Sequence, residues 1–596
     1  MLISKGVFTL KSHSTTTAAL IPVPPHLTPF CVEQNYDKYS PIDHAVWRYV
    51  LRQNSAFLAE KGYGSYEDGM RVTGMSTESV PNIEQMNLQL SKMGWGAVAI
   101  DGFIPPVAFF DFQAHRLLPI AGDIRTLDHI AYTPAPDIIH ESAGHAPMLH
   151  DPGYAEFLQF FGEIGAKALA SKEDHDLYEA IRLLSIVKED PRATALQVEE
   201  AEENLKRAEA AVIESSEAGD ISKLYWWTVE YGLIGSVSDP KIYGAGLLSS
   251  MGESRALYRP HVQKVAFDLH TCSTKDYNIT EPQPQLYVCE NFDQLTEAVK
   301  EFAKTMAYQV GGTVSLKKAL RSDNLATAVY SSGLQVSGTF THLEYDAQGE
   351  AVYLKTTGPT MLAVANQMLS GHDLEYHGEG FGSPIGLIKG HDTPLEDFSD
   401  TQLDAAGLQV GNVTDLTFVS GVTVSGEVTY ILREAGKIVL IGFDNCTVTH
   451  GDHVLFQAEW GTFDMAVGAV ITSVYAGAAD RAAWASSTFT KSALNTQRHE
   501  VTADEQKLYD LYQSIRNLRE ANSDDSGVQD LTARTVAVLD EAFPNDWLLR
   551  VEILELLAPK GLAPDLQAHI EQWLNELAAT DEGLQELIEN GINLAR

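Results

Sequence analysis

The chain has 596 residues, too many for one ordinary domain, so about two to four are expected. With 44% hydrophobic and 9% aromatic residues it can fill large cores, and disorder is not expected. There are 42 lysines and arginines against 81 aspartates and glutamates, a formal net charge of -39. This charge argues against nucleic acid or an anionic membrane as the main partner, because both bind basic surfaces.

The cysteine pattern and the apolar runs indicate a compartment. Four cysteines without a CxxC pair do not make a disulfide framework, which suits a reducing environment. The sequence shows neither an apolar run typical of a signal peptide nor a stretch of about eighteen apolar residues. We therefore expect a cytoplasmic protein, with assembly into a homo-oligomer left open.

The first part of the chain is predicted to be mainly helical. Residues 1–30 are expected to form a tail that ends in several prolines. Residues 35–170 alternate amphipathic stretches with turns, as helices do. They include residues 133–147, which read TPAPDIIHESAGHAP and hold two histidines and two acids between prolines.

His140 and His145 stand five residues apart, so an ideal α-helix would turn the second imidazole well away from the first. Gly144 and Pro147 favour a helix that ends or distorts here, which would bring His145 back toward the same metal ion. Zinc proteases place their histidines at i and i+4 instead. A zinc hydrolase with Glu141 as general base is therefore the less favoured alternative.

Residues 172–220 have apolar side chains at helical spacing on both sides of Pro191. The spacing after Pro191 is heptad-like. An antiparallel helical hairpin is the simplest interpretation, and packing against the protein itself is favoured over binding a partner. The apolar positions are Leu177, Ile181, Leu184, Val198, Ala201, Leu205, Ala208 and Val212.

A third candidate ligand follows the predicted hairpin. Glu230 lies in the aromatic run YWWTVEYG, residues 225–232. Two imidazoles and one carboxylate cover one face of a metal ion and leave the other open for oxygen and substrate, as in non-haem Fe(II) oxygenases. His140, His145 and Glu230 are therefore predicted to be iron ligands, and Asp137 is predicted to cap the helix that carries the first of them.

The sequence pattern changes after residue 310. Short β-like runs with turns between them predict a β-rich domain of unknown role over residues 311–495. Residues 496–596 return to helical periodicity and are predicted to form a helical C-terminal region. Regulation, assembly and simple covering of the catalytic part are the roles left open for both.

Several segments together resemble the pterin-dependent aromatic amino acid hydroxylases. They read YTPAPDIIHESAGHAPMLHDPGYAEFLQFFGEIG at 132–165, YWWTVEYGL at 225–233, YGAGLLSSMGE at 243–253 and, more loosely, YNITEPQPQLYV at 277–288. The stretch 34–47 is similar to bacterial members. The resemblance implies an α+β multidomain chain with a mainly α-helical hydroxylase domain at 31–310, interrupted by the hairpin and followed by the β-rich and helical regions.

The resemblance also implies roles for individual residues. His140, His145 and Glu230 match the iron ligands, and Glu141 matches an acid beside the pterin. Arg125 matches the arginine whose fork holds the substrate carboxylate. Further substrate-binding positions are Thr133, Trp226, Gly246 and Ser249, and cofactor-binding positions are Gly102, Phe103, Ile104, Phe109 and Tyr225. Core packing is the alternative for Phe103, Phe109 and Trp226.

The resemblance implies a phenylalanine 4-monooxygenase activity in aromatic amino acid catabolism. Such an enzyme hydroxylates the phenylalanine ring to give tyrosine, with O2 and a tetrahydropterin such as tetrahydrobiopterin at a mononuclear Fe(II). Tryptophan or tyrosine as substrate is the alternative within this chemistry. A non-catalytic regulatory protein would be expected to lose a ligand or Arg125, and the sequence retains them all.

Overall fold

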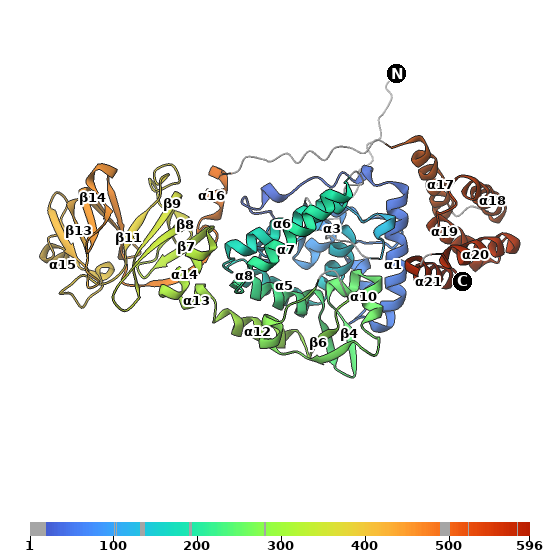
Figure 1. Ribbon diagram of the computed structural model, residues 1–596, viewed down its shortest axis with the longest axis horizontal. Helices are drawn as coiled ribbons and strands as arrows, with labels where there is room; N and C mark the ends of the chain where they lie inside the picture. The colour runs from blue at the N-terminus through green and yellow to red at the C-terminus, as the bar shows by residue number, and fades with distance from the viewer. Residues whose placement is uncertain are drawn as a thin grey trace, which may run out of the picture.

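The computed structural model describes residues 20–100, 102, 104–131, 137–189, 193–278, 282–488, 501–521, 524–580 and 582–596. Figure 1 shows three regions along its longest axis. A β-rich region lies at one end, a mixed region that carries the predicted site lies in the middle, and a helical C-terminal region lies at the other end. Within the described residues no helix is both long and apolar enough to span a membrane.

The central region is mainly helical, as predicted, but it also contains two small sheets. Strands β1 and β2 pair in parallel, and a four-stranded sheet has the order β4-β3-β6-β5. The elements are α1 (Pro41–Lys61), α2 (Tyr66–Val72), α3 (Ile83–Leu90), β1 (Gly96–Ile100), α4 (Pro106–Ala114), β2 (Leu117–Ala121), α5 (Pro152–Gly165), α8 (Glu217–Tyr225), β3 (Leu233–Ser236), β4 (Asp239–Ile242), α9 (Ala245–Ser249), α10 (Met251–Ala256), β5 (Gln263–Ala266), α11 (Leu269–Thr274), β6 (Gln285–Cys289), α12 (Phe292–Ala303) and α13 (Ala307–Val310).

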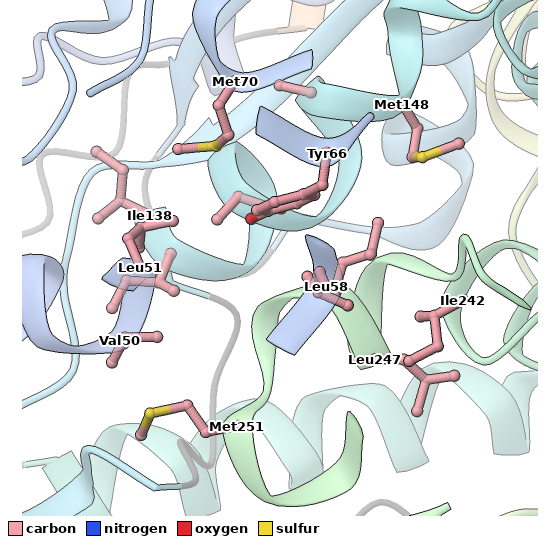
Figure 2. Packing of buried hydrophobic residues seen from close by; sticks show 14 of the residues in the cluster. Val50, Leu51, Leu58, Tyr66, Met70, Ile138, Met148, Ile242, Leu247 and Met251 are labelled. Atoms are coloured by element: carbon pink, nitrogen blue, oxygen red, sulfur yellow. The ribbon is translucent and has the colours of Figure 1, made fainter. Parts of the chain in front are cut away.

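Helix α1 anchors the core beneath the predicted site. Ser40 and Asp43 form a capping box at its start, and Pro41 takes the first helical position, where a missing N–H costs nothing. Figure 2 shows side chains of α1 among buried residues of α2, α9 and the histidine-bearing segment. The hydroxyl of Tyr66 donates to the carbonyl of Ala143 at 2.8 Å, which fixes that segment from below.

The predicted hairpin is present as α6 (Lys172–Glu189) and α7 (Ala195–Ala211), which pack against each other. Its predicted break at Pro191 lies outside the described residues. The base of the hairpin is closed, because the N–H of Ala218 donates to the carbonyl of Leu169 at 3.2 Å. The chain therefore leaves and re-enters the central region at nearly the same point.

The β-rich region has two antiparallel sheets, with the orders β10-β9-β8-β7-β17 and β12-β13-β14-β15. Strand β11 joins the first sheet through β9, and β16 joins the second through β14. The elements are α14 (Gly312–Ser322), β7 (Leu325–Tyr330), β8 (Leu334–Tyr345), β9 (Ala351–Val364), β10 (Gln367–Met368), β11 (Gly382–Pro384), α15 (Asp400–Ala405), β12 (Val413–Thr417), β13 (Val422–Glu434), β14 (Lys437–His450), β15 (His453–Phe456), β16 (Phe463–Ala466), β17 (Ile471–Ala476) and α16 (Arg481–Thr488). At the predicted turn between β13 and β14, Ala435 and Gly436 both have positive φ, which suits a tight hairpin.

Both flanking regions are docked on the central one. On one side, Arg481 of α16 pairs with Asp111 at 2.5 Å and donates to the carbonyl of Ala166 at 3.0 Å. On the other side, Arg48 of α1 pairs with Glu552 and Glu555. The C-terminal region contains α17 (Ala503–Glu520), α18 (Asp525–Ala542), α19 (Leu548–Leu557), α20 (Pro564–Ala578) and α21 (Glu582–Ala595), which Figure 1 shows beside α1.

Candidate metal centre and active site

The two predicted histidine ligands lie at the ends of a π-helical turn, His140–His145. Five residues rotate an α-helix roughly 140° out of alignment. A π-helix bonds residues i and i+5, so positions five apart share a face. The predicted distortion is confirmed, and its form explains the spacing. A 3-10 turn with Pro147 near its start follows directly.

Close contacts from neighbouring elements hold this turn. A Cβ added at Gly144 would lie 2.5 Å from the carbonyl of Ala245, so only glycine lets α9 pack this closely. The carboxylate of Asp137 accepts the N–H of His140 at 2.9 Å, as predicted for a capping residue. The position of His140 is thus fixed by the chain before it and by α9 behind it.

Glu230 ends a second π-helical turn, Trp226–Glu230, that continues α8. The chain entering α9 passes directly against it: a Cβ on Gly244 would lie 2.4 Å from the carbonyl of Glu230. A Cβ on Gly246 would lie 2.9 Å from the ring of Tyr231. These two glycines permit the close approach of α9 to the turn that carries Glu230.

The three predicted ligands converge. Nε2 of His145 lies 3.1 Å from Oε1 of Glu230, and Nε2 of His140 lies 3.3 Å from Oε2. The ligand atoms of all three lie within 4.8 Å of one another. His145 is completely buried, whereas the His140 side chain is 22% exposed, so the cluster opens on the side of His140.

The charges in this cluster suit a cation. Burial alone would lower the pKa of His140, but the Glu230 carboxylate outweighs it and raises this pKa to about 9. Burial alone would raise the pKa of Glu230, but the two imidazoles hold it well below its usual range. Glu230 is therefore a buried anion facing two ring nitrogens, a donor set that fits Fe(II) once the imidazole proton is displaced.

Ser249 determines which nitrogen of His140 faces the cluster. Its hydroxyl donates to the carbonyl of Ala245 at 2.8 Å and lies 3.1 Å from Nδ1 of His140. The hydroxyl proton is thus engaged with Ala245, so the Ser249 oxygen accepts the proton of Nδ1. Nε2 of His140 is left as the metal-binding atom. The sequence interpretation placed Ser249 beside the substrate and missed this contact, which joins residues 109 apart in the chain.

Glu141, the predicted cofactor-side acid, is buried rather than solvated. One of its carboxylate oxygens lies 3.9 Å from Nε2 of His145. Burial raises its pKa, and the two histidines oppose this shift. The structure therefore places a second carboxyl group at the cluster.

Arg125 is buried and forms a two-pronged ion pair with Asp137. Its Nε and one Nη donate to the two carboxylate oxygens, each at 2.8 Å. Burial would raise the pKa of Asp137, but Arg125 holds it below the usual value. The sequence assigned these residues separate roles, yet they form one unit.

Trp226 lies in a stack of three aromatic rings. Its ring centroid is 4.2 Å from that of Tyr277 and 4.5 Å from that of Tyr231, with both pairs nearly parallel. Tyr277 was not among the predicted site residues. Burial and the charge of Glu230 raise the pKa of Tyr277 to about 12.

The predicted pterin positions lie in two settings. Gly102 has a φ of +52°, and Ile104 is half-buried against a small cluster of apolar side chains. Phe109 meets Tyr225 edge-on, and the hydroxyl of Tyr225 accepts a bond from Gln113 at 2.7 Å. Two predicted positions, Phe103 and Thr133, lie outside the described residues.

Comparison with known proteins places this centre in a family. The family described as "Biopterin-dependent aromatic amino acid hydroxylase" matches residues 35–184 and 210–314, and the gap falls within the hairpin. Two relatives are each named "Phenylalanine-4-hydroxylase". The one from Ralstonia nicotianae is 30% identical over 48% of this chain and 77% of the relative. The one from Mesorhizobium japonicum is 30% identical over 45% of this chain and 82% of the relative. A crystal structure of the Chromobacterium violaceum phenylalanine hydroxylase with bound Fe(III) aligns at 28% identity with a TM-score of 0.35, over 46% of this chain and 84% of that one. The chain belongs to the biopterin-dependent aromatic amino acid hydroxylase family.

Proposed function

We propose that this protein is a tetrahydropterin-dependent monooxygenase that hydroxylates phenylalanine to tyrosine at an Fe(II) held by His140, His145 and Glu230. The observation that carries the proposal is the convergence of these three side chains from two π-helical turns, with their ligand atoms within 4.8 Å. The names of the two relatives support phenylalanine as the substrate.

The protein's contribution is to orient the metal ligands and to exclude water from the site. When bound, Fe(II) and the tetrahydropterin supply the electrons and the site for activating O2. Ser249 keeps Nδ1 of His140 protonated, so Nε2 faces the metal position. Glu230 supplies the negative charge that offsets a divalent cation, and the burial of His145 keeps water from that side. Glu141 adds a carboxyl group that can hold a water molecule beside the cofactor.

The substrate and pterin contacts follow from the family motifs. Asp137 holds the Arg125 guanidinium in one orientation, which leaves its free donors ready for the carboxylate of an amino acid. Around the substrate we place Thr133, Trp226, Gly246 and Ser249. Around the pterin we place Gly102, Phe103, Ile104, Phe109, Tyr225 and Glu141.

We further propose a division of the chain into a tail at 1–30, a catalytic domain at 31–310, a β-rich domain at 311–495 and a helical region at 496–596. Arg481 and Arg48 dock the last two on opposite parts of the catalytic domain, which supports a covering and stabilising role. A cytoplasmic location and self-association into a homo-oligomer remain predictions from the sequence.

Product analysis tests the proposed function. Purified protein is supplied with Fe(II), tetrahydrobiopterin, O2 and either phenylalanine, tyrosine or tryptophan. Tyrosine formed from phenylalanine, in proportion to the pterin oxidised, is the expected result. Preferential hydroxylation of tryptophan or tyrosine would shift the substrate assignment, and failure to hydroxylate any of the three by iron-loaded protein would overturn the proposal.

A further inference from the structure

A second set of metal-binding side chains lies in the β-rich region, outside the proposed catalytic domain. It consists of His372, His377 and Asp464, whose ligand atoms also lie within 4.8 Å of one another. All three side chains are buried, at 9%, 7% and 5% exposure. The proposed hydroxylation uses none of them.

The two histidines lie on a turn between β10 and β11 that is bonded to the adjacent strand. On β9, the N–H of Leu362 donates to the carbonyl of His372, and that of Thr360 donates to the carbonyl of His377, both at 3.1 Å. The carboxylate of Asp373 accepts two backbone N–H groups within the turn. The two imidazole rings are nearly parallel, and Nδ1 of His372 and Nε2 of His377 are hydrogen-bonded at 3.1 Å.

Asp464 approaches from the other sheet. It stands on β16 opposite Gly442 of β14, and Tyr430 of β13 stands opposite the same glycine. A Cβ on Gly442 would lie 2.2 Å from the Tyr430 ring, so the ring occupies space that only glycine leaves. The hydroxyl of Tyr430 donates to Asp464. Asp464 is thus oriented by a supporting hydroxyl.

The cluster lies in a buried and acidic setting. Burial lowers the pKa of His377 to about 4 and also lowers that of His372, and it raises the pKa of Asp464. The other charged groups that act on the cluster are Asp373 and Asp444, both acidic. Two imidazoles and a carboxyl group whose ligand atoms converge within 4.8 Å in an acidic setting are the donor types that a divalent ion requires.

We propose that His372, His377 and Asp464 bind a divalent first-row transition metal ion, with Zn(II) as the best fit, as a clamp between the two sheets. Two imidazoles and a carboxylate suit zinc, whereas calcium and magnesium prefer all-oxygen sites. A fourth position is available to water or to the Tyr376 hydroxyl. The ion would tie the turn between β10 and β11 to β16, and through it to β14.

Metal titration of the full-length chain tests this proposal. Metal-free protein is titrated with Zn(II) and with Co(II), whose visible spectrum reports coordination by nitrogen and oxygen. In a His140→Ala/Glu230→Gln background, where the catalytic centre is disabled, one equivalent should still bind and should raise the midpoint of thermal unfolding. Adding Asp464→Asn or His377→Ala should abolish this binding, whereas His391→Ala, a histidine elsewhere in the β-rich region, should not change it.

A supporting residue gives a graded test. Tyr430→Phe keeps the ring and removes the hydroxyl that orients Asp464, so Zn(II) binding should weaken by about 10–100-fold. If the folded His140→Ala/Glu230→Gln protein binds no stoichiometric Zn(II) or Co(II), the proposal is wrong. It is equally wrong if the remaining equivalent survives both Asp464→Asn and His377→Ala in protein that unfolds cooperatively.

Discussion

The hydroxyl oxygen of Ser249 lies 3.1 Å from Nδ1 of His140, while its proton points to the carbonyl of Ala245. The geometry makes Ser249 an acceptor toward the histidine. A residue at the end of α9 thus selects the tautomer of a proposed ligand 109 positions earlier in the chain.

Ser249→Ala is expected to weaken Fe(II) binding by about 10–100-fold, because His140 loses the partner that fixes its tautomer and ring orientation. Iron content after dialysis against a graded chelator measures this loss. Ser254→Ala is the matched control, because the hydroxyl of this buried serine of α10 donates to the backbone carbonyl of Met251. Equal iron retention in both variants would show that Ser249 does not orient the ligand.

Arg125→Lys is expected to raise KM for the amino acid while iron stays bound, because lysine keeps the charge and loses the fork. Arg125→Ala should cost about 2–5 kcal/mol in apparent substrate binding. It should also lower thermal stability, since Asp137 would remain buried without its partner. Steady-state kinetics and thermal unfolding separate the two effects. A folded Arg125→Lys enzyme with unchanged KM would refute the substrate role.

The hairpin is expected to be dispensable for chemistry, but only up to the start of α8. Glu217 accepts bonds from the N–H groups of Leu169 and Ala307 and from Lys318, so removal of the whole predicted insertion would take away a structural residue. Replacing residues 175–212 with a short Gly-Ser linker should preserve hydroxylation, because the base is already closed. Loss of iron from a folded deletion variant would contradict this expectation, and Glu217→Gln should destabilise the full-length chain.

The ion pair between Asp111 and Arg481 predicts acid sensitivity where the β-rich region is docked. Burial opposes ionisation of Asp111, but His115, His26 and Arg481 outweigh it and hold its pKa well below the usual value. A lowered folded-state pKa stabilises the protein above the unfolded value of about 4, and this contribution is lost as the pH falls below it.

Asp111→Asn should therefore reduce stability at pH 7, by less than the roughly 3–5 kcal/mol of a fully buried pair because Arg481 reaches solvent. The midpoint of thermal unfolding of this variant should also fall less steeply than that of the wild type as the pH is lowered from about 5 to 3. Asp68→Asn, which breaks an exposed pair with Arg71, is the control and should change little. An unchanged acid profile in Asp111→Asn would exclude this pair as its source.

Much of the site could be predicted because its ligands are local features of the sequence. The five-residue histidine spacing and Gly144 predicted a distorted helix, and the structure contains one. Its π-helical form could not be predicted, because it depends on α9 packing against Gly144 from a segment about a hundred residues away. The Trp226–Tyr277 stack and the Arg125–Asp137 pair were missed for the same reason, since each joins residues whose proximity only the fold creates.

In the wider fold too, local features could be predicted from the sequence and contacts between distant segments could not. Short β-like runs with turns between them predicted a β-rich domain, and the structure has strands there such as β9, β13, β14 and β15, because such runs and turns are local features of the sequence. Sheet order and docking are not local: Arg48 reaches Glu555 across 507 positions of sequence. The second histidine cluster likewise forms only where a turn and a strand from different sheets come together. The spacing of His372 and His377 in the sequence therefore did not predict it.

We propose that Glu230 completes an iron centre that hydroxylates phenylalanine. The most direct test measures iron content and tyrosine formation together in wild-type and Glu230→Gln protein, both supplied with tetrahydrobiopterin and O2. The glutamine keeps the side chain's shape but removes the charge that offsets Fe(II). A folded Glu230→Gln protein is expected to bind iron weakly and to lose nearly all tyrosine formation. Wild-type iron content and activity in that variant would contradict this proposal.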